Sequence, residues 1–473
     1  MGKERISGMQ KTSIKKNFMY QMIYQILIII LPFVTSPYIA RVIGAEGLGT
    51  YSYSYSIAYY FVLFSMLGLS NYGNRIIAQN RESQDKLNEV FSNVLAIHML
   101  FSFGCFIIYC IYAFFVAKER VYAIIQTAYV LSGIFDISWF YFGIEKFKLT
   151  VTRNTIIKIL NVICVFTFVK QPSDLWKYCI IMAFGMLISQ ITLWIPLKKY
   201  VKLVKPEMAK MVIHIKPLLI LFIPAIAVSL YKYMDKIMIG TLSSKAQLGY
   251  YENAEKMINI PLAIIMSFGT VMLPKMSNLV SSNNRAEANR YIGLSMKYVM
   301  CLAFALAFGL AGIGKVFAPV FWGKEFYLSG LLIMGLSTTI PFMSFANVIR
   351  TQYLIPTERD KEYLSSVIGG AIVNLIINGC LIPRYGAIGA TIVIQAWVVR
   401  KELPLKKYIV NMIPFLIFGF GMFVVVYGYG RMFDTGLKTL FVQITIGAFL
   451  YCGITCIYMY VTNDAFVVST IQK

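Results

Sequence analysis

One apolar stretch of this 473-residue chain contains an unusual group of charges, Tyr231-Lys232-Tyr233-Met234-Asp235-Lys236. Lys232 and Lys236 are four residues apart and would share one face of a helix, and Asp235 is three residues from Lys232, a spacing that permits an ion pair. A charge at the centre of a bilayer costs about 2.5–3.5 kcal/mol on insertion scales, so such charges often mark a polar path. The net positive group predicts an anion site in which Asp235 holds a lysine or exchanges a coupling ion. A structural ion pair with a neighbouring helix is the alternative.

Four further charged residues lie within or beside apolar stretches. Arg41 is a candidate for the outer mouth of the same cavity, and Glu255 lies near the start of an apolar segment. Asp136 could pair with a cavity cation or hydrogen-bond Ser or Tyr hydroxyls. Arg75 could be a membrane anchor, which is the interpretation we favour for it. The candidate substrate-binding residues are therefore Arg41, Arg75, Asp136, Lys232, Asp235, Lys236 and Glu255.

The sequence predicts no catalytic residue, metal site or cofactor. It contains no GxxxxGK[ST] phosphate loop and no HExxH motif, so ATP and metal-assisted hydrolysis are not indicated. Its two histidines are His98 and His214. For His98, which lies in the middle of an apolar segment, packing at a helix interface is favoured over a role as a proton carrier. The eight cysteines all fall in apolar segments and have no metal or disulfide pattern.

These residues must be positioned by membrane-spanning helices. Hydrophobic residues make up 58% of the chain and charged residues 14%, and a span needs about 20 apolar residues. The runs are too long and too continuous for the alternating strands of a barrel. We predict spans at about 18–40, 51–73, 90–116, 121–143, 154–170, 175–197, 213–240, 247–273, 291–313, 325–347, 362–382, 386–399, 408–430 and 437–461. The twelfth is short for a full span.

The formal net charge of +23 follows the expected topology. With the N-terminus inside, the inner connections carry 28 Lys and Arg and the outer ones 11, as the positive-inside rule predicts. This asymmetry accounts for most of the charge without a nucleic-acid partner. It places both termini in the cytoplasm, and the first apolar run, with Pro32 and Pro37, is interpreted as a retained helix and not as a cleaved signal.

The two halves of the chain resemble each other. Arg41-Val-Ile-Gly44 is followed by Leu48-Gly49 and Tyr51, and Lys236-Ile-Met-Ile-Gly240 is followed by Leu248-Gly249 and a tyrosine. The offset of six segments predicts a parallel repeat, the arrangement of transporters that hold their substrate between two lobes. The first copy is followed by the run Tyr51-Ser-Tyr-Ser-Tyr55. On a helix, Tyr51, Tyr55 and Tyr59 would lie on one face. That stripe could contact sugars, although an interfacial aromatic belt is the favoured interpretation.

Several motifs together resemble one family. They are Pro37 to Gly49, Asn71 to Arg75, Asp136 to Gly143, Met234 to Gly240, Gly249 to Lys256, and Asn374 to Gly389. In this order they are similar to bacterial lipid-linked oligosaccharide repeat-unit flippases of the multidrug/oligosaccharidyl-lipid/polysaccharide exporter superfamily. The resemblance implies an all-α polytopic membrane protein of about 14 helices, with two six-helix lobes around a central cationic cavity and two C-terminal helices.

The resemblance also implies an activity and a location. The expected activity is export of undecaprenyl-pyrophosphate-linked repeat units for capsule, O-antigen or exopolysaccharide across the bacterial cytoplasmic membrane, with a polysaccharide polymerase and other assembly proteins as possible partners. The domain boundaries that we predict are a cytoplasmic segment 1–17, a first lobe 18–200, a cytoplasmic linker 201–212, a second lobe 213–400, and two further helices with a tail in 401–473.

Three other classes stay open on the residues alone. A drug/cation antiporter of the same superfamily would need more carboxylates facing the cavity, and a flippase for the peptidoglycan lipid precursor would share the fold. An integral-membrane glycosyltransferase or polymerase would place catalytic residues in large outer loops, but the outer loops here are short.

Overall fold

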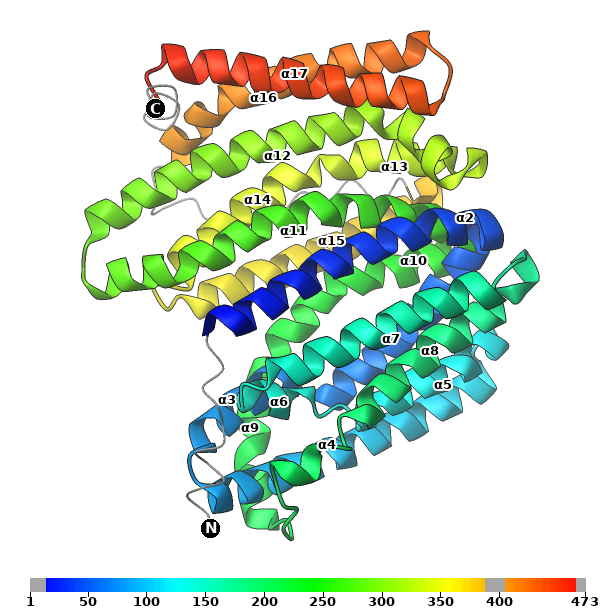
Figure 1. Ribbon diagram of the computed structural model, residues 1–473, viewed down its shortest axis with the longest axis vertical. Coiled ribbons are helices and arrows are strands. Elements are labelled where there is room, and N and C mark those ends of the chain that lie inside the picture. Colours follow the sequence, from blue (N-terminus) through cyan, green and yellow to red (C-terminus); the bar gives the residue numbers. More distant parts are fainter. Residues whose placement is uncertain (1–13, 388–404, 465–473) are drawn as a thin grey trace. The chain divides into compact units, whose positions relative to one another are not determined.

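The computed structural model describes residues 14–387 and 405–464, and every regular element in these ranges is helical (Figure 1). Eleven helical stretches are long and apolar enough to cross a membrane, and they coincide with eleven of the fourteen predicted spans. The first predicted span and most of the second fall in α2 (Ile14–Met66). The short twelfth, 386–399, lies almost wholly outside the described residues, as do most of segment 1–17 and the C-terminal tail. The all-helical membrane fold is confirmed, whereas a count of fourteen spans is not.

The helix α2 joins two predicted spans without the loop expected between them. It is interrupted at Gly44, whose backbone angles (φ 69°, ψ 179°) are not helical, and Figure 1 shows the blue ribbon changing direction along this helix. A residue with a Cβ would be strained at that φ, so glycine permits the break. A second interruption follows at Leu67 (φ 42°) and Gly68 (φ 75°), before α3 (Leu69–Asn80) begins.

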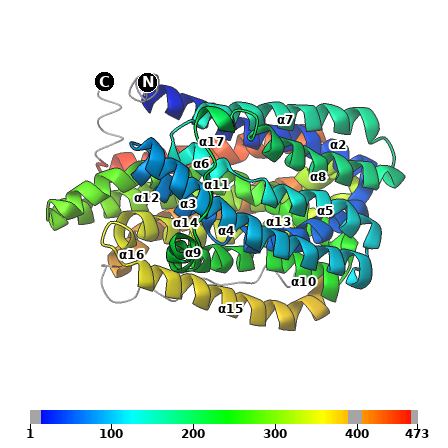
Figure 2. The same ribbon diagram turned by 90° about the horizontal axis from the view of Figure 1, so that it is seen from below.

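The chain forms two compact units, one ending at Gly240 and the other beginning at Thr241. In the first unit α2 packs on several neighbours, and α7 and α8 lie side by side in both views (Figures 1 and 2). Its remaining elements are α4 (Gln84–Ile111) with a π-helical turn Tyr112–Val116, α5 (Arg120–Ile134), α6 (Ser138–Gly143), α7 (Phe147–Phe168), α8 (Leu175–Thr192), α9 (Met208–Ser229), a π-helical turn Leu230–Met234, and α10 (Asp235–Leu242).

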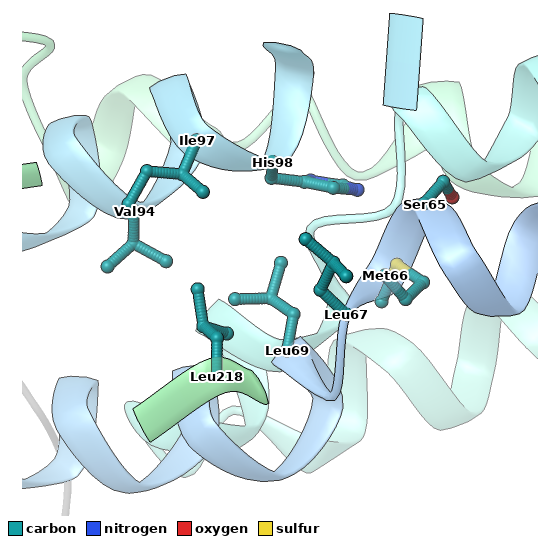
Figure 3. Close-up of a pocket in the computed structure, with 8 residues that line it drawn as sticks. All are labelled: Ser65, Met66, Leu67, Leu69, Val94, Ile97, His98 and Leu218. Atoms are coloured by element: carbon teal, nitrogen blue, oxygen red, sulfur yellow. The ribbon is translucent and has the colours of Figure 1, made fainter. Parts of the chain in front are cut away.

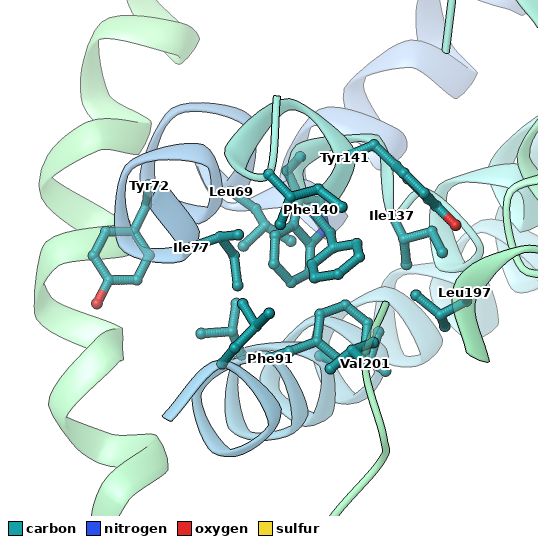
Figure 4. Close-up of a cluster of buried hydrophobic side chains, with 14 of the residues drawn as sticks. Leu69, Tyr72, Ile77, Phe91, Ile137, Phe140, Tyr141, Leu197 and Val201 are labelled. Carbon is teal, nitrogen blue, oxygen red and sulfur yellow. The ribbon is translucent and has the colours of Figure 1, made fainter. Parts of the chain in front are cut away.

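A buried aromatic cluster holds α3, α4 and α6 together. Phe91 of α4 packs against Trp139 and Phe140 of α6, with ring centroids 5.5 and 4.7 Å apart, and Ile77 of α3 joins them (Figure 4). A Cβ added at Gly73 would lie 2.5 Å from the Trp139 ring. The close contact between α3 and α6 therefore depends on glycine.

The predicted linker 201–212 is extended over its first part and is held along α4. Backbone N–H groups of Lys202, Val204 and Glu207 donate to side-chain oxygens of α4, those of Asn88 (2.9 Å), Ser92 (3.0 Å) and Asn93 (2.9 Å). The following helix α9 packs on α3 and α4. Segment 213–240, placed in the second lobe by the repeat, thus forms part of the first compact unit.

The hydrogen bonds between segment 201–207 and α4, called here the clasp, should weaken when the α4 side chains are removed. We expect Asn88→Ala combined with Asn93→Ala to lower the free energy of unfolding by about 2 kcal/mol, because each net hydrogen bond contributes about 1 kcal/mol. Thermal unfolding of the detergent-purified protein measures this change. The matched control is Gln79→Ala on the exposed side of α3, and equal melting temperatures for the two variants would contradict the role of the clasp.

The second unit is organised around one long helix, α12 (Arg285–Trp322), which contacts α11, α13, α14, α16 and α17. The other helices are α11 (Lys245–Ser281), α13 (Tyr327–Ser337), α14 (Thr339–Ile349) with a π-helical turn Arg350–Leu354, α15 (Asp360–Tyr385), α16 (Leu405–Met432) and α17 (Leu437–Val461). The start of α11 is capped by the Ser244 hydroxyl, which accepts from Gln247 N at 3.2 Å. The first copy of the repeat has the Gly44 break at the corresponding place, so the two copies differ there.

The C-terminal helix pair is tied to α12 by polar contacts. Asp464, just beyond α17, pairs with the Lys297 ammonium and accepts from the Tyr298 hydroxyl at 2.7 Å. The Tyr451 hydroxyl of α17 donates to the Cys301 carbonyl at 2.8 Å. The side chain of Asp464 is 5% exposed, so Lys297 is an ion-pair partner here and not a side chain that simply extends to the membrane surface.

Breaking this pair on one side should be costly. We expect Asp464→Asn to lower the free energy of unfolding by roughly 3 kcal/mol, because it leaves the Lys297 charge without its counter-ion in a mainly buried site. Replacing both residues, Lys297→Met with Asp464→Leu, should recover most of that loss. Melting curves of the three proteins test the expectation, and a double variant less stable than Asp464→Asn would contradict it.

Candidate functional site

The charged group Tyr231–Lys236 belongs to the seventh predicted span, 213–240, called here segment seven. It lies where a helix changes its winding. Here α9, which contains Pro217 and Pro224, passes into the π-helical turn Leu230–Met234 and then into α10. Such turns are rare and are frequent at functional sites. Lys232 and Asp235 were expected to pair because they would be three residues apart on a regular α-helix. The π-helical turn alters that spacing, and Lys232 is exposed whereas Asp235 is 5% exposed.

Three tyrosines of α2, Tyr51, Tyr55 and Tyr59, form a row that reaches this turn and is called here the tyrosine ladder. Tyr51, Tyr55 and Tyr59 follow one another with ring centroids 5.8 and 6.5 Å apart. Tyr59 stacks on Tyr233 of the turn at 3.8 Å, and the Lys236 ammonium lies 5.5 Å from the centroid of the Tyr233 ring. That distance permits a cation–π interaction. The tyrosine stripe predicted on α2 therefore leads to one of the candidate lysines.

A neighbouring contact fixes the turn itself. The Tyr60 hydroxyl donates to the carbonyl of Ser229, the last residue of α9, at 3.1 Å. Tyr60 is also close enough to Asp235 for an electrostatic interaction. Tyr59 and Tyr60 together hold the π-helical turn against α2, and this arrangement gathers Asp235, Lys236 and the tyrosine ladder in one place of the first unit.

Asp136 lies where α5 ends and α6 begins. Its carboxylate accepts hydrogen bonds from the backbone N–H of Ser138 at 2.9 Å and from the Ser138 hydroxyl at 2.5 Å. Its own carbonyl accepts from the Trp139 indole at 3.1 Å. These contacts hold the turn that leads into the short helix α6, so of the two roles considered for Asp136, local hydrogen bonding is the one for which the structure describes contacts.

The remaining candidates are on other helices. Arg41 is exposed on α2 before the Gly44 break. Arg75 is exposed on α3, 5.9 Å from the ring centroid of Tyr72. Glu255 is half-buried on α11 and belongs to the second unit. The contacts described for Arg75 and Asp136 do not include the segment-seven residues, so the described structure groups only some of the seven candidates.

Two kinds of feature had not been predicted from the sequence. The π-helical turns carry no local signature, although Pro224 before the turn in segment seven is compatible with irregular winding. The interruptions at Leu67–Gly68 and Phe135–Ile137 could have been suspected from Gly68 and from Asp136 followed by Ser138. Within residues 14–387 and 405–464, no group of three or more His, Cys, Asp or Glu side chains is arranged to hold a metal ion.

Three known proteins similar to this chain are named as O-antigen transporters or as a capsular polysaccharide biosynthesis protein. The chain is 24% identical over 382 residues to a putative O-antigen transporter of Shigella dysenteriae, covering 80% of this chain and 95% of that protein. It is 21% identical to a putative O-antigen transporter of Escherichia coli K12, covering 82% and 94%. It is 22% identical to the capsular polysaccharide biosynthesis protein CapF of Staphylococcus aureus, covering 80% and 95%.

Solved structures share the fold. The lipid II flippase MurJ in its inward closed conformation matches with a TM-score of 0.76 at 16% identity, covering 94% of this chain and all of that one. An inward-facing multidrug resistance MATE family transporter of the MOP superfamily matches with a TM-score of 0.56 at 12% identity, covering 82% and 94%. At these identities the likeness establishes the fold of a multi-pass membrane protein.

The family is established by sequence. The model of the polysaccharide biosynthesis protein family matches residues 14–280, more than half of the chain. That match begins with α2 and extends nearly to the end of α11, and so includes the π-helical turn Leu230–Met234, the tyrosine ladder and the three helix interruptions described for the first unit. The chain belongs to the polysaccharide biosynthesis protein family.

Proposed function

We propose that this protein is a flippase that moves lipid-linked oligosaccharide repeat units across the bacterial cytoplasmic membrane. The observation that carries the proposal is the similarity to O-antigen transporters over four fifths of this chain and nearly the full length of those proteins. The glycan flippase Agl15 of Haloferax volcanii is similar over half of the chain. These relatives are transporters, and the protein is accordingly a transporter and not an enzyme.

The substrate that we propose is a glycan linked through pyrophosphate to undecaprenol. The pyrophosphate is anionic, and hydrogen bonds between a charged donor and a phosphate oxygen are among the strong ones in proteins. Lys236 and Lys232 are the proposed donors. Lys236 lies over Tyr233 at 5.5 Å, and the tyrosine already contacts the ladder of α2, so the ammonium is held near aromatic side chains.

The glycan requires a polar path, because its hydroxyl groups would lose their hydrogen bonds in lipid. Tyr51, Tyr55 and Tyr59 of α2 are partly exposed and present rings and hydroxyl groups along one face of the helix. Sugar rings can pack on aromatic faces while their hydroxyls bond to neighbouring polar groups. We propose that the glycan moves along this side of α2 while the polyprenyl tail stays in lipid.

Transport by alternating access would be driven by an ion gradient or by the membrane potential. The sequence has no nucleotide-binding motif, and moving one charge through the membrane potential is worth about 2.3 kcal/mol per 100 mV. Both termini would lie in the cytoplasm, as the distribution of Lys and Arg indicates. A polysaccharide polymerase that accepts the exported units is the proposed partner outside.

A cell lacking its own repeat-unit flippase tests the proposal. Expression of this chain should restore surface polysaccharide, and purified protein in liposomes should expose a fluorescent polyprenyl-pyrophosphate trisaccharide to an added quencher. The matched specificity control is a cell depleted of its peptidoglycan lipid-precursor flippase, which this chain should not rescue. Rescue of that cell alone would replace the proposed substrate by the peptidoglycan precursor, and no movement of either lipid would refute flipping.

A further inference from the structure

The ring of His98 is buried without hydrogen bonds in the first unit. The residue lies on α4, is 2% exposed, and neither Nδ1 nor Nε2 makes a hydrogen bond of standard geometry. A buried polar group without a partner costs about 1–3 kcal/mol, and such a group requires an explanation. A histidine that only fills space could be replaced by an apolar residue that avoids this cost.

Two helix interruptions meet at this ring. The residues around it include Ser65, Met66 and Leu67 at the end of α2, next to the left-handed backbone of Leu67 and Gly68 (Figure 3). The Asp136 carboxylate, in the interruption between α5 and α6, is close enough to act electrostatically on the ring, and the Gly133 carbonyl lies near it. Interrupted helices expose backbone groups that can hold ions, and in transporters they mark the sites of coupling.

The polar groups around the ring form a connected set. The Ser102 hydroxyl, one turn along α4, donates to the Ser65 carbonyl at 3.4 Å. A Cβ added at Gly133 would lie 3.0 Å from the Ser65 hydroxyl, so the three helices α2, α4 and α5 are in close contact here. Figure 3 shows the His98 ring on the side of the pocket that carries Ser65.

The ionisable groups near His98 can be assigned to their helices. Asp136 comes from the α5–α6 interruption, and α2 contributes the neutral Ser65. The pocket residues from α3 and α9 are Leu69 and Leu218. On these two helices Tyr72 and His214 are titratable, and they hydrogen-bond to each other. A proton on His98 would therefore have Asp136 as its counter-ion.

We propose that His98 binds the proton that couples flipping to a pH gradient. In the described conformation neither ring nitrogen has a hydrogen bond of standard geometry, and the Asp136 carboxylate accepts from Ser138. When the interruptions rearrange, the ring takes a proton from one side of the membrane, and Asp136 and the carbonyl of Gly133 or Ser65 stabilise the imidazolium. Return to the described conformation releases that proton to the other side. This inference rests on the proposed transport function.

The chain provides a matched control, because it has two histidines. Nδ1 of His214 already shares a hydrogen bond of 2.5 Å with the Tyr72 hydroxyl, and the Tyr72 side chain is buried. The two rings thus differ in the feature on which the proposal depends, a nitrogen without a partner. His214→Gln makes the same histidine-to-glutamine change as His98→Gln and therefore controls for the loss of a histidine.

The first test uses the wild-type protein labelled with 15N-histidine. Two sets of ring signals are expected, and the His214→Gln protein assigns them. We expect the His98 nitrogens to change from the neutral to the doubly protonated form on acidification, in parallel with the change in flipping rate measured across the same pH range. A His98 ring that stays neutral throughout would overturn the proposal, and this measurement leaves His98 itself unchanged.

The second test measures coupling in proteoliposomes with the membrane potential clamped. With the fluorescent polyprenyl-pyrophosphate trisaccharide, a gradient of one pH unit should accelerate wild-type flipping by up to tenfold, since one unit corresponds to a factor of ten in proton activity. We expect the ratio of rates with and without the gradient to fall to about one in His98→Gln and to persist in His214→Gln. A ratio unchanged in His98→Gln would refute the assignment. Wild-type flipping without any effect of the gradient would refute the coupling alone, whereas no wild-type flipping would refute the proposed function.

Discussion

A leucine in place of Gly330 is expected to prevent folding of the second unit. Gly330 of α13 lies against Gly314 of α12, and a Cβ at position 330 would be 2.5 Å from the Gly314 carbonyl oxygen and 3.0 Å from the Lys315 Cα. These are backbone atoms, which cannot turn aside as a flexible side chain can. Overpacking of a tight core usually costs about 1–3 kcal/mol, and a direct clash with the central helix α12 should exceed that range. Size-exclusion profiles and melting curves of detergent-purified protein measure the loss.

The control for this variant is a glycine of the same unit with open surroundings. A Cβ at Gly421 of α16 would meet no atom within 4 Å. Gly421→Ala should therefore leave the protein unchanged or stabilise it by up to about 1 kcal/mol, the difference in helix propensity. A Gly330→Leu protein that purifies and melts like Gly421→Ala would show that α12 and α13 can separate without consequence.

Neutralising both lysines of segment seven should have the largest effect on transport. Lys232→Gln with Lys236→Gln removes two proposed donors to the pyrophosphate, and a hydrogen bond to a charged group contributes about 1.5–3 kcal/mol. We expect the flipping rate at low substrate concentration to fall at least tenfold, while the amount of protein in the membrane stays the same. The liposome assay with the fluorescent trisaccharide lipid measures this rate.

The charge-matched control lies outside the ladder region. Lys198→Gln with Lys199→Gln removes the same positive charge from two exposed residues after α8. This double variant should flip substrate at the wild-type rate. Equal losses in both double variants would indicate a general effect of net charge, and normal transport by Lys232→Gln/Lys236→Gln would remove these lysines from the proposed site.

The apolar segments could be predicted because the bilayer imposes a minimum length and an apolar composition on every span. Segment 408–430 differs from α16 by only a few residues at its ends, and segment 437–461 coincides with α17. In place of the loop expected after Arg41, two helices meet at a sharp break at Gly44. A single glycine can permit a sharp break, and composition alone does not distinguish that arrangement from a loop.

The site was less accessible to sequence reasoning. Spacing placed Lys232 and Asp235 on one face, but the π-helical turn changes the rotation per residue, and one side chain is exposed while the other is buried. The stacking of Tyr59 on Tyr233 joins residues 174 positions apart in the chain, and nothing local in either segment specifies such a contact. The bond from Tyr60 to Ser229 is of the same long-range kind.

The clasp between α4 and the segment 201–207 has a consequence for biosynthesis. Asn88 receives its partner from Lys202, 114 residues later, and at about 5–20 residues per second a ribosome needs roughly 6–23 seconds to add that length. During this interval Asn88 and Ser92 keep partners within α4, since Asn88 Oδ1 accepts from Gln84 Nε2 and the Ser92 hydroxyl donates to the Asn88 carbonyl. Asn93 has yet to meet the backbone N–H of Glu207. The first unit thus closes late in its own synthesis, and a truncation that ends before residue 202 should leave the nascent chain dependent on chaperones even though most of its helices have been made.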